Sequence, residues 1–174
     1  MAPPSNVTLE QIPGGTAGTL TTLRRMHQLV REAVVDPGVR DVALAIVRPC
    51  PGRAYTCQLR ALRAWLAGRF RFRRDPYRVE WAMAPAKQLA TVRGQGFVEG
   101  DCDDAAILAA ALGQAVGFPA RFVVLGFLGA RGPYGHVYTE LQAPASPWVE
   151  FDVTRSRLPT PPLPPSRVAV YPIE

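Results

Sequence analysis

The chain has 174 residues, of which 48% are hydrophobic and 20% charged, and its formal net charge is +6. A chain of this length fits one domain that buries roughly 70% of its unfolded surface, so a core can form without a disulfide framework. No apolar run reaches the roughly 18 residues that span a bilayer, and the sequence opens without a basic and apolar signal peptide. We therefore expect a cytoplasmic protein with no membrane span.

Positive charge comes mainly from arginine. Lys87 is the only lysine, and most of the arginine excess lies between Arg24 and Arg74. Arginines on amphipathic helices usually form a solvated face, and no recognised nucleic-acid motif or regular aromatic interleaving accompanies them here. We expect no nucleic-acid partner, and keep a module that binds an anionic polymer as an alternative.

The first half of the chain shows the spacing of helices. Residues 1–18 read as an extended arm, and residues 19–70 as a helical leader in which Pro37-Gly38 stops the first helix. Apolar residues at helical spacing predict helices over residues 19–35, 39–47, 55–69 and, for one or two turns, 85–92. Between the last two, residues 70–81 read as short extended segments broken at Pro76.

The second half combines one apolar helix with short strands. Residues 102–116 leave almost no polar face, so this helix should be enclosed and should end at a left-handed Gly117. Strands are expected over residues 120–127, 134–142 and 147–154. Residues 156–174 read as a proline-rich strap that ends in an edge strand over 168–171. The order predicts an α+β fold with a single domain over 19–155, in which a buried helix packs on a small antiparallel sheet.

A cysteine, a histidine and an aspartate occupy the start of this helix and two of these strands. Cys102 lies in Gly100-Asp101-Cys102-Asp103-Asp104. A hairpin centred on Pro144 pairs residues whose numbers sum to about 288, which His136 and Asp152 satisfy. Opposite residues have Cβ atoms roughly 4.5–5.5 Å apart, so Asp152 can bind one imidazole nitrogen and leave the other for a thiol. The same register places an apolar set on the reverse face: Val137, Leu141, Val149, Phe151 and Val153.

The start of the helix acts on Cys102 in two opposite ways. Unpaired amides and the helix dipole lower a thiol pKa and stabilise an oxyanion. Asp101 as N-cap, Asp104 as its capping partner and Asp103 oppose a thiolate. His136 must then do more of the activation. For the oxyanion, the Cys102 amide is the first donor, and Gln95 in a glycine-flanked loop is a tentative second.

Other residues have simpler interpretations. Alone, Cys102 would be a buried small hydrophobe, and Cys50 and Cys57 either pair or stay reduced beside a loop. His27 on the first helix is expected to be a surface or capping residue. Two histidines and scattered cysteines predict no metal site. Two tryptophans are expected to pack at the core or rim: Trp81 and Trp148.

These motifs resemble the transglutaminase-like superfamily of papain-fold cysteine enzymes. The resemblance rests on Gly100-Asp101-Cys102-Asp103-Asp104, on Gly135-His136-Val137-Tyr138-Thr139-Glu140 and on Phe151-Asp152-Val153-Thr154. Gly117-Phe118-Pro119-Ala120-Arg121 is similar to the family's turn into its first strand, and the resemblance covers roughly residues 55–155. Compact size and the helical leader look most like members encoded by bacteriophages and prophages.

The resemblance implies a Cys102-His136-Asp152 triad that forms a thioester with a peptide or protein substrate and needs no cofactor or metal. Water as the second nucleophile gives a hydrolase and a lysine amine gives a crosslink; we favour hydrolysis of peptide or isopeptide bonds. The alternative is a structural component of a virion or tail assembly that binds partner proteins and requires no catalysis. The expected location is a bacterial host cytoplasm or a virion.

Overall fold

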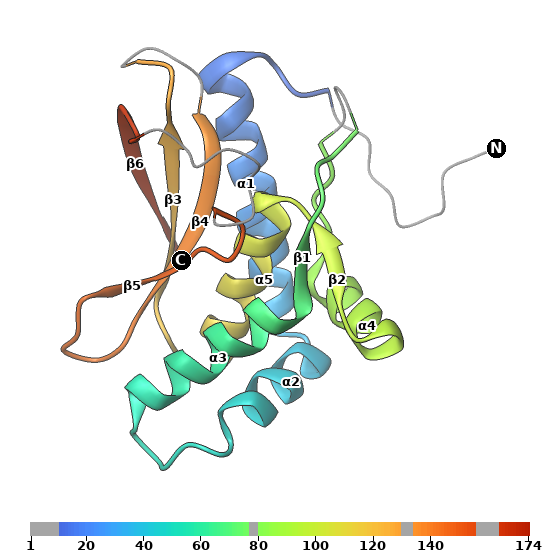
Figure 1. The fold of residues 1–174 in the computed structure, drawn as a ribbon, viewed down its shortest axis with the longest axis vertical. Helices are drawn as coiled ribbons and strands as arrows, with labels where there is room; N and C mark the ends of the chain where they lie inside the picture. Colours follow the sequence, from blue (N-terminus) through green and yellow to red (C-terminus); the bar gives the residue numbers. More distant parts are fainter. Residues whose placement is uncertain (1–10, 77–79, 130–133, 156–163) are drawn as a thin grey trace.

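In the computed structural model, which describes residues 11–76, 80–129, 134–155 and 164–174, a central helix lies between a four-stranded antiparallel sheet and several other helices, while the first helix also contacts the sheet (Figure 1). The helices are α1 (Gly15–Val34), α2 (Pro37–Val47), α3 (Tyr55–Arg69), α4 (Pro85–Gln95) and α5 (Cys102–Ala115). The strands are β1 (Phe70–Phe72), β2 (Val98–Gly100), β3 (Ala120–Gly126), β4 (Tyr134–Gln142), β5 (Trp148–Phe151) and β6 (Arg167–Ile173). The α+β fold class is therefore confirmed. Within the described ranges, no helix is both long and apolar enough to cross a membrane.

The first two helices begin earlier than their apolar spacing predicts. Helix α1 starts at Gly15, inside the expected arm. Helix α2 starts at Pro37, because Asp36 caps it: the Asp36 carboxylate accepts hydrogen bonds from the amides of Gly38 (2.8 Å) and Val39 (3.1 Å). Proline favours the first position of a helix, where its missing N–H is not needed. Pro37 therefore opens the second helix as well as following the first.

Helix α5 is buried because its neighbours cover nearly every side. It contacts α1, α2, α3 and β4, and its residues from Asp103 to Gly113 are all buried. A Cβ on Gly113 would lie 2.5 Å from the Leu141 side chain, so the glycine permits close approach to β4. The Thr139 hydroxyl also donates a 2.7 Å hydrogen bond to the Ala106 carbonyl. These contacts fix α5 along β4.

The sheet has the order β5-β4-β3-β6, with neighbouring strands antiparallel. Thr139 pairs with Phe151, so the β4–β5 hairpin is shifted by two residues from the predicted register, and His136 is not directly opposite Asp152. The physical reason is a turn that extends past Pro144 through Ala145, which has a φ of 55°. A shift of two keeps every side chain on its face. Strand β5 also ends at Phe151 instead of residue 154.

The short pair β1–β2 and the last strand complete the framework. Strand β2 had no clear sequence signal; it pairs with β1 in parallel, placing Phe72 beside Gly100, two residues before Cys102. Strand β6 pairs with β3 and is longer than the expected strand over 168–171. The first eight residues of the predicted strap, 156–163, and most of the predicted arm, residues 1–10, lie outside the described residues.

Cys50 and Cys57 form a disulfide across the loop between α2 and α3, with their Cα atoms 5.8 Å apart. The pairing that the sequence left open is thus made in the structure, and Cys102 is the free cysteine. Disulfides persist mainly in oxidising compartments. The compartment itself stays a prediction.

Candidate active site

Cys102 is the first residue of α5, and the residues around it explain why the helix begins there. Asp101 is the N-cap, and its Oδ1 accepts a 3.0 Å hydrogen bond from the Asp103 amide. Asp104 Oδ1 accepts a 2.7 Å hydrogen bond from the Met83 amide, and the Asp101 amide also bonds this carboxylate. A Cβ on Gly100 would lie 2.4 Å from Asp104 Oδ2, so only glycine fits at this position.

His136 and Asp152 form a buried hydrogen-bonded pair. His136 Nε2 lies 2.7 Å from Asp152 Oδ2, and the two side chains are 3% and 1% exposed. Asp152 Oδ1 accepts hydrogen bonds from the Thr154 amide, the Thr154 hydroxyl and the Arg155 amide, at 3.0, 3.1 and 3.0 Å. Burial alone would raise the pKa of Asp152, but its bond to His136, the imidazole charge and these amides lower it overall. With Nε2 on the carboxylate, the free ring nitrogen is Nδ1.

The short length of β5 explains how the three residues meet. Strand β5 pairs with β4 only as far as Thr139, so among the described strands the edge of β4 at His136 and Val137 has no neighbour on that side. Asp152 enters there directly after β5 ends. The Cys102 sulfur enters from α5, where the Val137 amide hydrogen-bonds it. The sulfur therefore lies beside the residue that follows His136.

The side-chain hydrogen bond of the Cys102 thiol, however, goes to Asp103 Oδ1 at 3.5 Å. His136 is not among the hydrogen-bond partners of this thiol in the described part of the chain. The structure thus joins His136 to Asp152 directly and brings Cys102 to the same strand edge without a sulfur–imidazole hydrogen bond.

Burial and negative charge keep the Cys102 thiol protonated at rest. Its pKa is raised well above the ordinary value by burial, then by Asp103 and Asp101, and only the Val137 amide opposes this. Burial and Asp75 raise the pKa of Asp101 to about 6. The pKa of Asp103 is also raised, by burial, Asp101 and Glu80. Of the two opposing effects that the sequence indicates at this helix start, burial and the carboxylates outweigh the helix terminus.

Gln95, the tentative second oxyanion donor, lies at the exposed end of α4. Its Nε2 donates a 3.2 Å hydrogen bond to the Phe97 carbonyl. This contact does not bring Gln95 into the hydrogen bonds around Cys102, so Gln95 has no part in the mechanism proposed below. The buried glutamine of α4 is Gln88, which donates to the carbonyls of Met83 (2.9 Å) and Asp104 (3.1 Å). No sequence signal distinguishes Gln88 from other polar helix residues.

Thr154 is a second residue that the sequence analysis did not single out. It supplies two of the hydrogen bonds that orient Asp152. The spacing Asp152-Val153-Thr154 is a sufficient signal, because an aspartate often accepts from the amide two residues further on.

His27, Trp81 and Trp148 make packing or surface contacts. His27 on α1 lies against Phe122, with ring centroids 5.3 Å apart, and its pKa is lowered by burial and then by Arg31. Trp148 lies under the Arg121 guanidinium at 4.2 Å. Trp81 is 48% exposed, and its amide donates to the Asp75 carboxylate.

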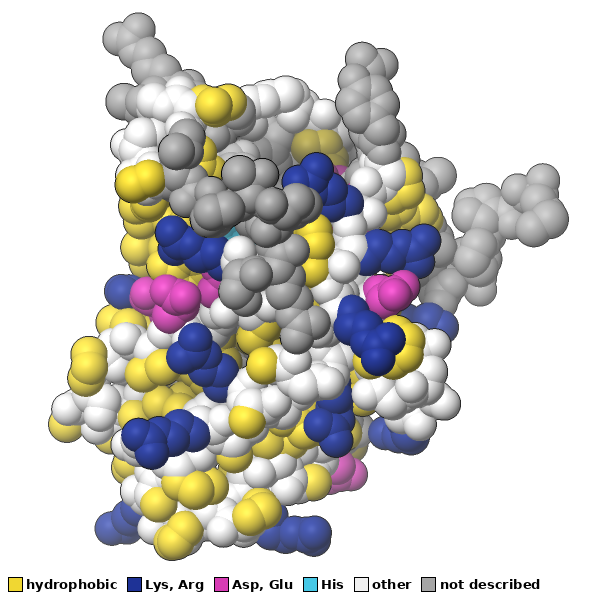
Figure 2. Space-filling model, in the orientation of Figure 1, with side chains coloured by type: hydrophobic (Ala, Val, Ile, Leu, Met, Phe, Trp, Pro, Cys, Tyr) yellow, Lys and Arg dark blue, Asp and Glu magenta, His cyan; other side chains and the backbone are white. Residues whose placement is uncertain are grey.

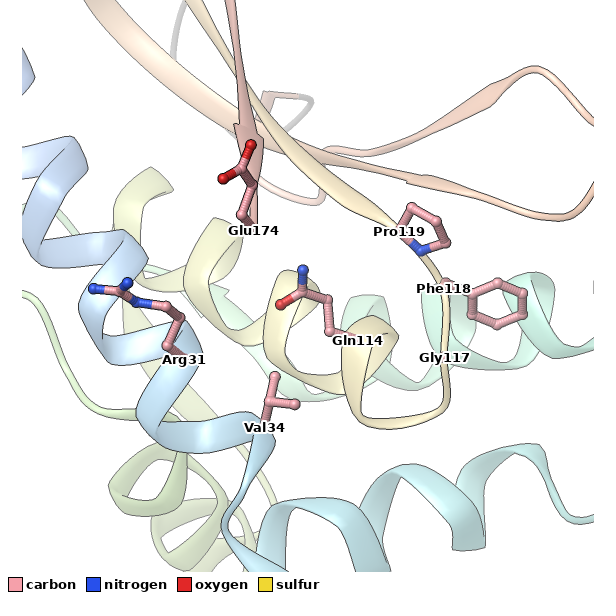
Figure 3. A pocket seen from close by; sticks show the side chains of 7 residues that line it. All are labelled: Arg31, Val34, Gln114, Gly117, Phe118, Pro119 and Glu174. Carbon is pink, nitrogen blue, oxygen red and sulfur yellow. The ribbon is translucent and has the colours of Figure 1, made fainter.

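A cavity of about 370 Å³ lies at the opposite end of α5 from Cys102 (Figure 3). Its lining residues are Arg31, Val34, Gln114, Gly117, Phe118, Pro119 and Glu174. Gln114 lies twelve positions after Cys102 on this helix, or roughly 18 Å along the helix axis at 1.5 Å per residue. This cavity is therefore not the substrate site of the Cys102 thiol.

Two further features bear on ligands. On the face shown in Figure 2, arginine and lysine side chains are scattered among apolar and polar ones instead of forming one basic patch. At the start of α5, one side-chain oxygen or sulfur atom each of Asp101, Cys102 and Asp103 lies within 4.8 Å of the others.

Comparison with known proteins yields one family. A family model described as the Transglutaminase-like superfamily matches residues 40–153. A crystal structure of a proposed cysteine protease from Cytophaga hutchinsonii is similar at 19% sequence identity and a TM-score of 0.49, over 68% of this chain and 37% of that one. No curated protein sequence matches the chain. Neither similarity bears on the resemblance to phage-encoded members, which stays a prediction together with virion or tail partners.

Proposed function

Because the chain belongs to the transglutaminase-like superfamily, we propose that it is a cysteine hydrolase that cleaves peptide or isopeptide amide bonds through a thioester. Cys102 is the nucleophile, His136 the general base and acid, and Asp152 the residue that orients the imidazole. The observation that carries this proposal is the buried 2.7 Å contact between His136 Nε2 and Asp152 Oδ2, at the strand edge where the Val137 amide bonds the Cys102 sulfur.

The reaction begins from a neutral thiol. Because the pKa of Cys102 is raised, a resting thiolate–imidazolium pair is disfavoured, and the thiol turns from Asp103 to His136 Nδ1 when substrate is bound. Nδ1 then takes the thiol proton as sulfur bonds to the carbonyl carbon. Asp152 stays ionised: it accepts a hydrogen bond from the Nε2–H group of His136 and stabilises the imidazolium that forms.

The carbonyl oxygen becomes an oxyanion at the start of α5. The Asp101 carboxylate accepts hydrogen bonds from the backbone amides of Asp103 and Asp104. In the first turn of α5, the backbone amide of Cys102 is therefore the donor left to bind the oxyanion. The imidazolium returns its proton to the departing amine as the carbon–nitrogen bond breaks, which leaves a thioester on Cys102. Water, deprotonated by His136, attacks the thioester and releases the acid and the thiol.

A peptide library incubated with the full chain, with and without a small primary amine, tests this proposal. Mass spectrometry detects new termini from hydrolysis and new amides from transfer to the amine. We expect new termini to predominate and Cys102→Ser to abolish both products. Asp41→Asn, which changes an exposed aspartate on α2, is the matched control and should retain wild-type turnover. Turnover that survives Cys102→Ser contradicts the proposal, and amides in excess of termini indicate an acyltransferase.

A further inference from the structure

The cavity at the far end of α5 carries two opposite charges that do not pair with each other. Arg31 of α1 and Glu174, directly after β6, both line it, and both residues are exposed. Burial and Arg31 lower the pKa of His27, while Glu174 acts in the opposite direction, so both charges lie near this ring. The ion pairs between described residues are three others: Arg73–Glu99, Arg121–Glu140 and His136–Asp152. A guanidinium and a carboxylate are therefore both left for a ligand in this cavity.

Gln114, in the last turn of α5, adds an oriented acceptor to the same cavity. Its Nε2 donates a 2.9 Å hydrogen bond to the Ile173 carbonyl. Because a carbonyl oxygen only accepts, the NH₂ group of Gln114 must face Ile173, and this fixes the position of Oε1. Within the described ranges, no protein group donates a hydrogen bond to that oxygen. A ligand with an N–H group can therefore bind it.

The remaining wall of the cavity is apolar. It comes from Val34, Phe118 and Pro119, and Figure 3 shows Phe118 and Pro119 across Gln114 from the two charged residues. Sites for small molecules have volumes of roughly 300–1,000 Å³ and are mostly apolar, with a few polar groups that fix orientation. A cavity of about 370 Å³ lies at the lower end of that range. It suits a small ligand with one apolar part and two opposite charges.

We propose that this cavity binds a free α-amino acid with an apolar side chain. The ammonium group of the ligand donates to the Glu174 carboxylate and to Gln114 Oε1, and its carboxylate accepts two parallel hydrogen bonds from the Arg31 guanidinium. The apolar side chain packs against Val34 and Phe118. Arg31 is long and exposed, so it turns towards the ligand without a change in the backbone. Binding is noncovalent, and the site does not depend on the proposed function.

Titration of the full chain with L-phenylalanine tests the site without any turnover. NMR of the His27 ring reports binding, because Arg31 and Glu174 both act on it. We expect a His27 shift that saturates at one ligand per chain, while His136, near the Cys102 end of α5, does not shift. N-acetylphenylalanine lacks the ammonium group, phenylalaninamide lacks the carboxylate, and glycine lacks the apolar side chain. Each should bind at least about 10-fold more weakly than phenylalanine.

Two variants assign each charge to its partner. Arg31→Gln should weaken phenylalanine binding by at least about 10-fold and leave phenylalaninamide unaffected, because the amide has no carboxylate for the guanidinium to bind. Glu174→Gln should weaken phenylalanine binding similarly and leave N-acetylphenylalanine unaffected. Arg63→Gln and Asp41→Asn make the same changes in charge at exposed positions of α3 and α2 and should bind as the wild type does. The circular dichroism of all four variants should match that of the wild type.

Three results would overturn the proposal. One is the absence of a saturable His27 shift up to roughly 10 mM phenylalanine. Another is equal binding of phenylalanine by the wild type, Arg31→Gln and Glu174→Gln, which would mean that the charges do not hold the ligand. The third is equal binding of phenylalanine and phenylalaninamide by the wild type, which would replace the free amino acid by the amino-terminal residue of a peptide.

Discussion

Replacing Asp152 by asparagine should trap the His136 imidazole in the tautomer that cannot accept the thiol proton. Asp152 Oδ1 accepts from the Thr154 amide, the Thr154 hydroxyl and the Arg155 amide, so an asparagine must keep its carbonyl oxygen there. Its NH₂ group then faces His136 Nε2, which must become an acceptor. The ring hydrogen moves to Nδ1, the nitrogen that the mechanism needs free.

The size of the effect follows from the hydrogen bonds exchanged. The productive tautomer loses a bond to a charged acceptor, worth about 1.5–3 kcal/mol, and the unproductive tautomer gains a neutral one worth about 0.5–1.5 kcal/mol. The sum is roughly 2–4.5 kcal/mol, which lowers the rate roughly 30- to 2000-fold. His136→Ala should lose more activity, because it removes the base altogether.

Nitrogen-15 NMR of the imidazoles measures the tautomer directly, and the chain contains only two histidines to assign, His27 and His136. In the wild type we expect hydrogen on Nε2 of His136, and in Asp152→Asn on Nδ1. Library hydrolysis is measured on the same samples. The reasoning is refuted if Asp152→Asn keeps the wild-type tautomer and rate, or loses more activity than His136→Ala.

Four further outcomes are expected. Cys102→Ser should keep the wild-type circular dichroism and lose at least about 1000-fold in turnover; retention within tenfold would exclude the thiol mechanism. Gly100→Ala should cost about 1–3 kcal/mol in urea unfolding, because the new Cβ overlaps the Asp104 carboxylate; an unchanged midpoint would contradict that contact. Burial raises the pKa of Asp104 from 3.8 to about 7. The folded state therefore holds the Asp104 proton more tightly than the unfolded state, and the resulting stabilisation is complete below pH 3.8 and is lost as the pH rises through 7. In EDTA the melting temperature should therefore fall by roughly 2–8 °C between pH 5 and pH 8, and by less in Asp104→Asn. Reducing the Cys50–Cys57 disulfide should cost roughly 2–3 kcal/mol, while equal stability would mean that the bond does not form.

The sequence predicts helices and strands best where the spacing of apolar residues and the positions of the flanking turn residues indicate the same boundaries. The spacing of apolar residues and the flanking turn residues predict α3 over 55–69 and β4 over 134–142 to their observed ends. Strand β2 is not predictable in this way. It consists of Val98–Gly100 alone and is held by pairing with β1, more than 25 residues earlier in the chain.

The hairpin register shows where a local pattern stops being sufficient. Alternation fixes which face each residue takes, but two registers that differ by two residues satisfy it equally. The turn decides between them, and it uses a left-handed Ala145, a residue type that gives no signal for that conformation. Asp152 meets His136 all the same, because it approaches from beyond the end of β5.

The sequence predicts that Cys102, His136 and Asp152 lie in one region. It does not predict how strongly the surrounding carboxylates act on the thiol. The carboxylates of Asp101, Asp103 and Asp104 are visible in the sequence. Their burial, and the approach of Asp75 and Glu80 from another segment, depend on tertiary packing. The resting protonation of the thiol could therefore be stated only from the structure.

Acylation of the full chain by an activated ester, p-nitrophenyl acetate, tests most directly whether Cys102 is a nucleophile served by His136. Peptide mapping locates the acyl group, and release of nitrophenolate gives the rate. We predict a stoichiometric burst with the acyl group on Cys102, and acylation at least about 100-fold slower in His136→Ala. Acylation at another residue, or an equal rate in His136→Ala, would contradict the account.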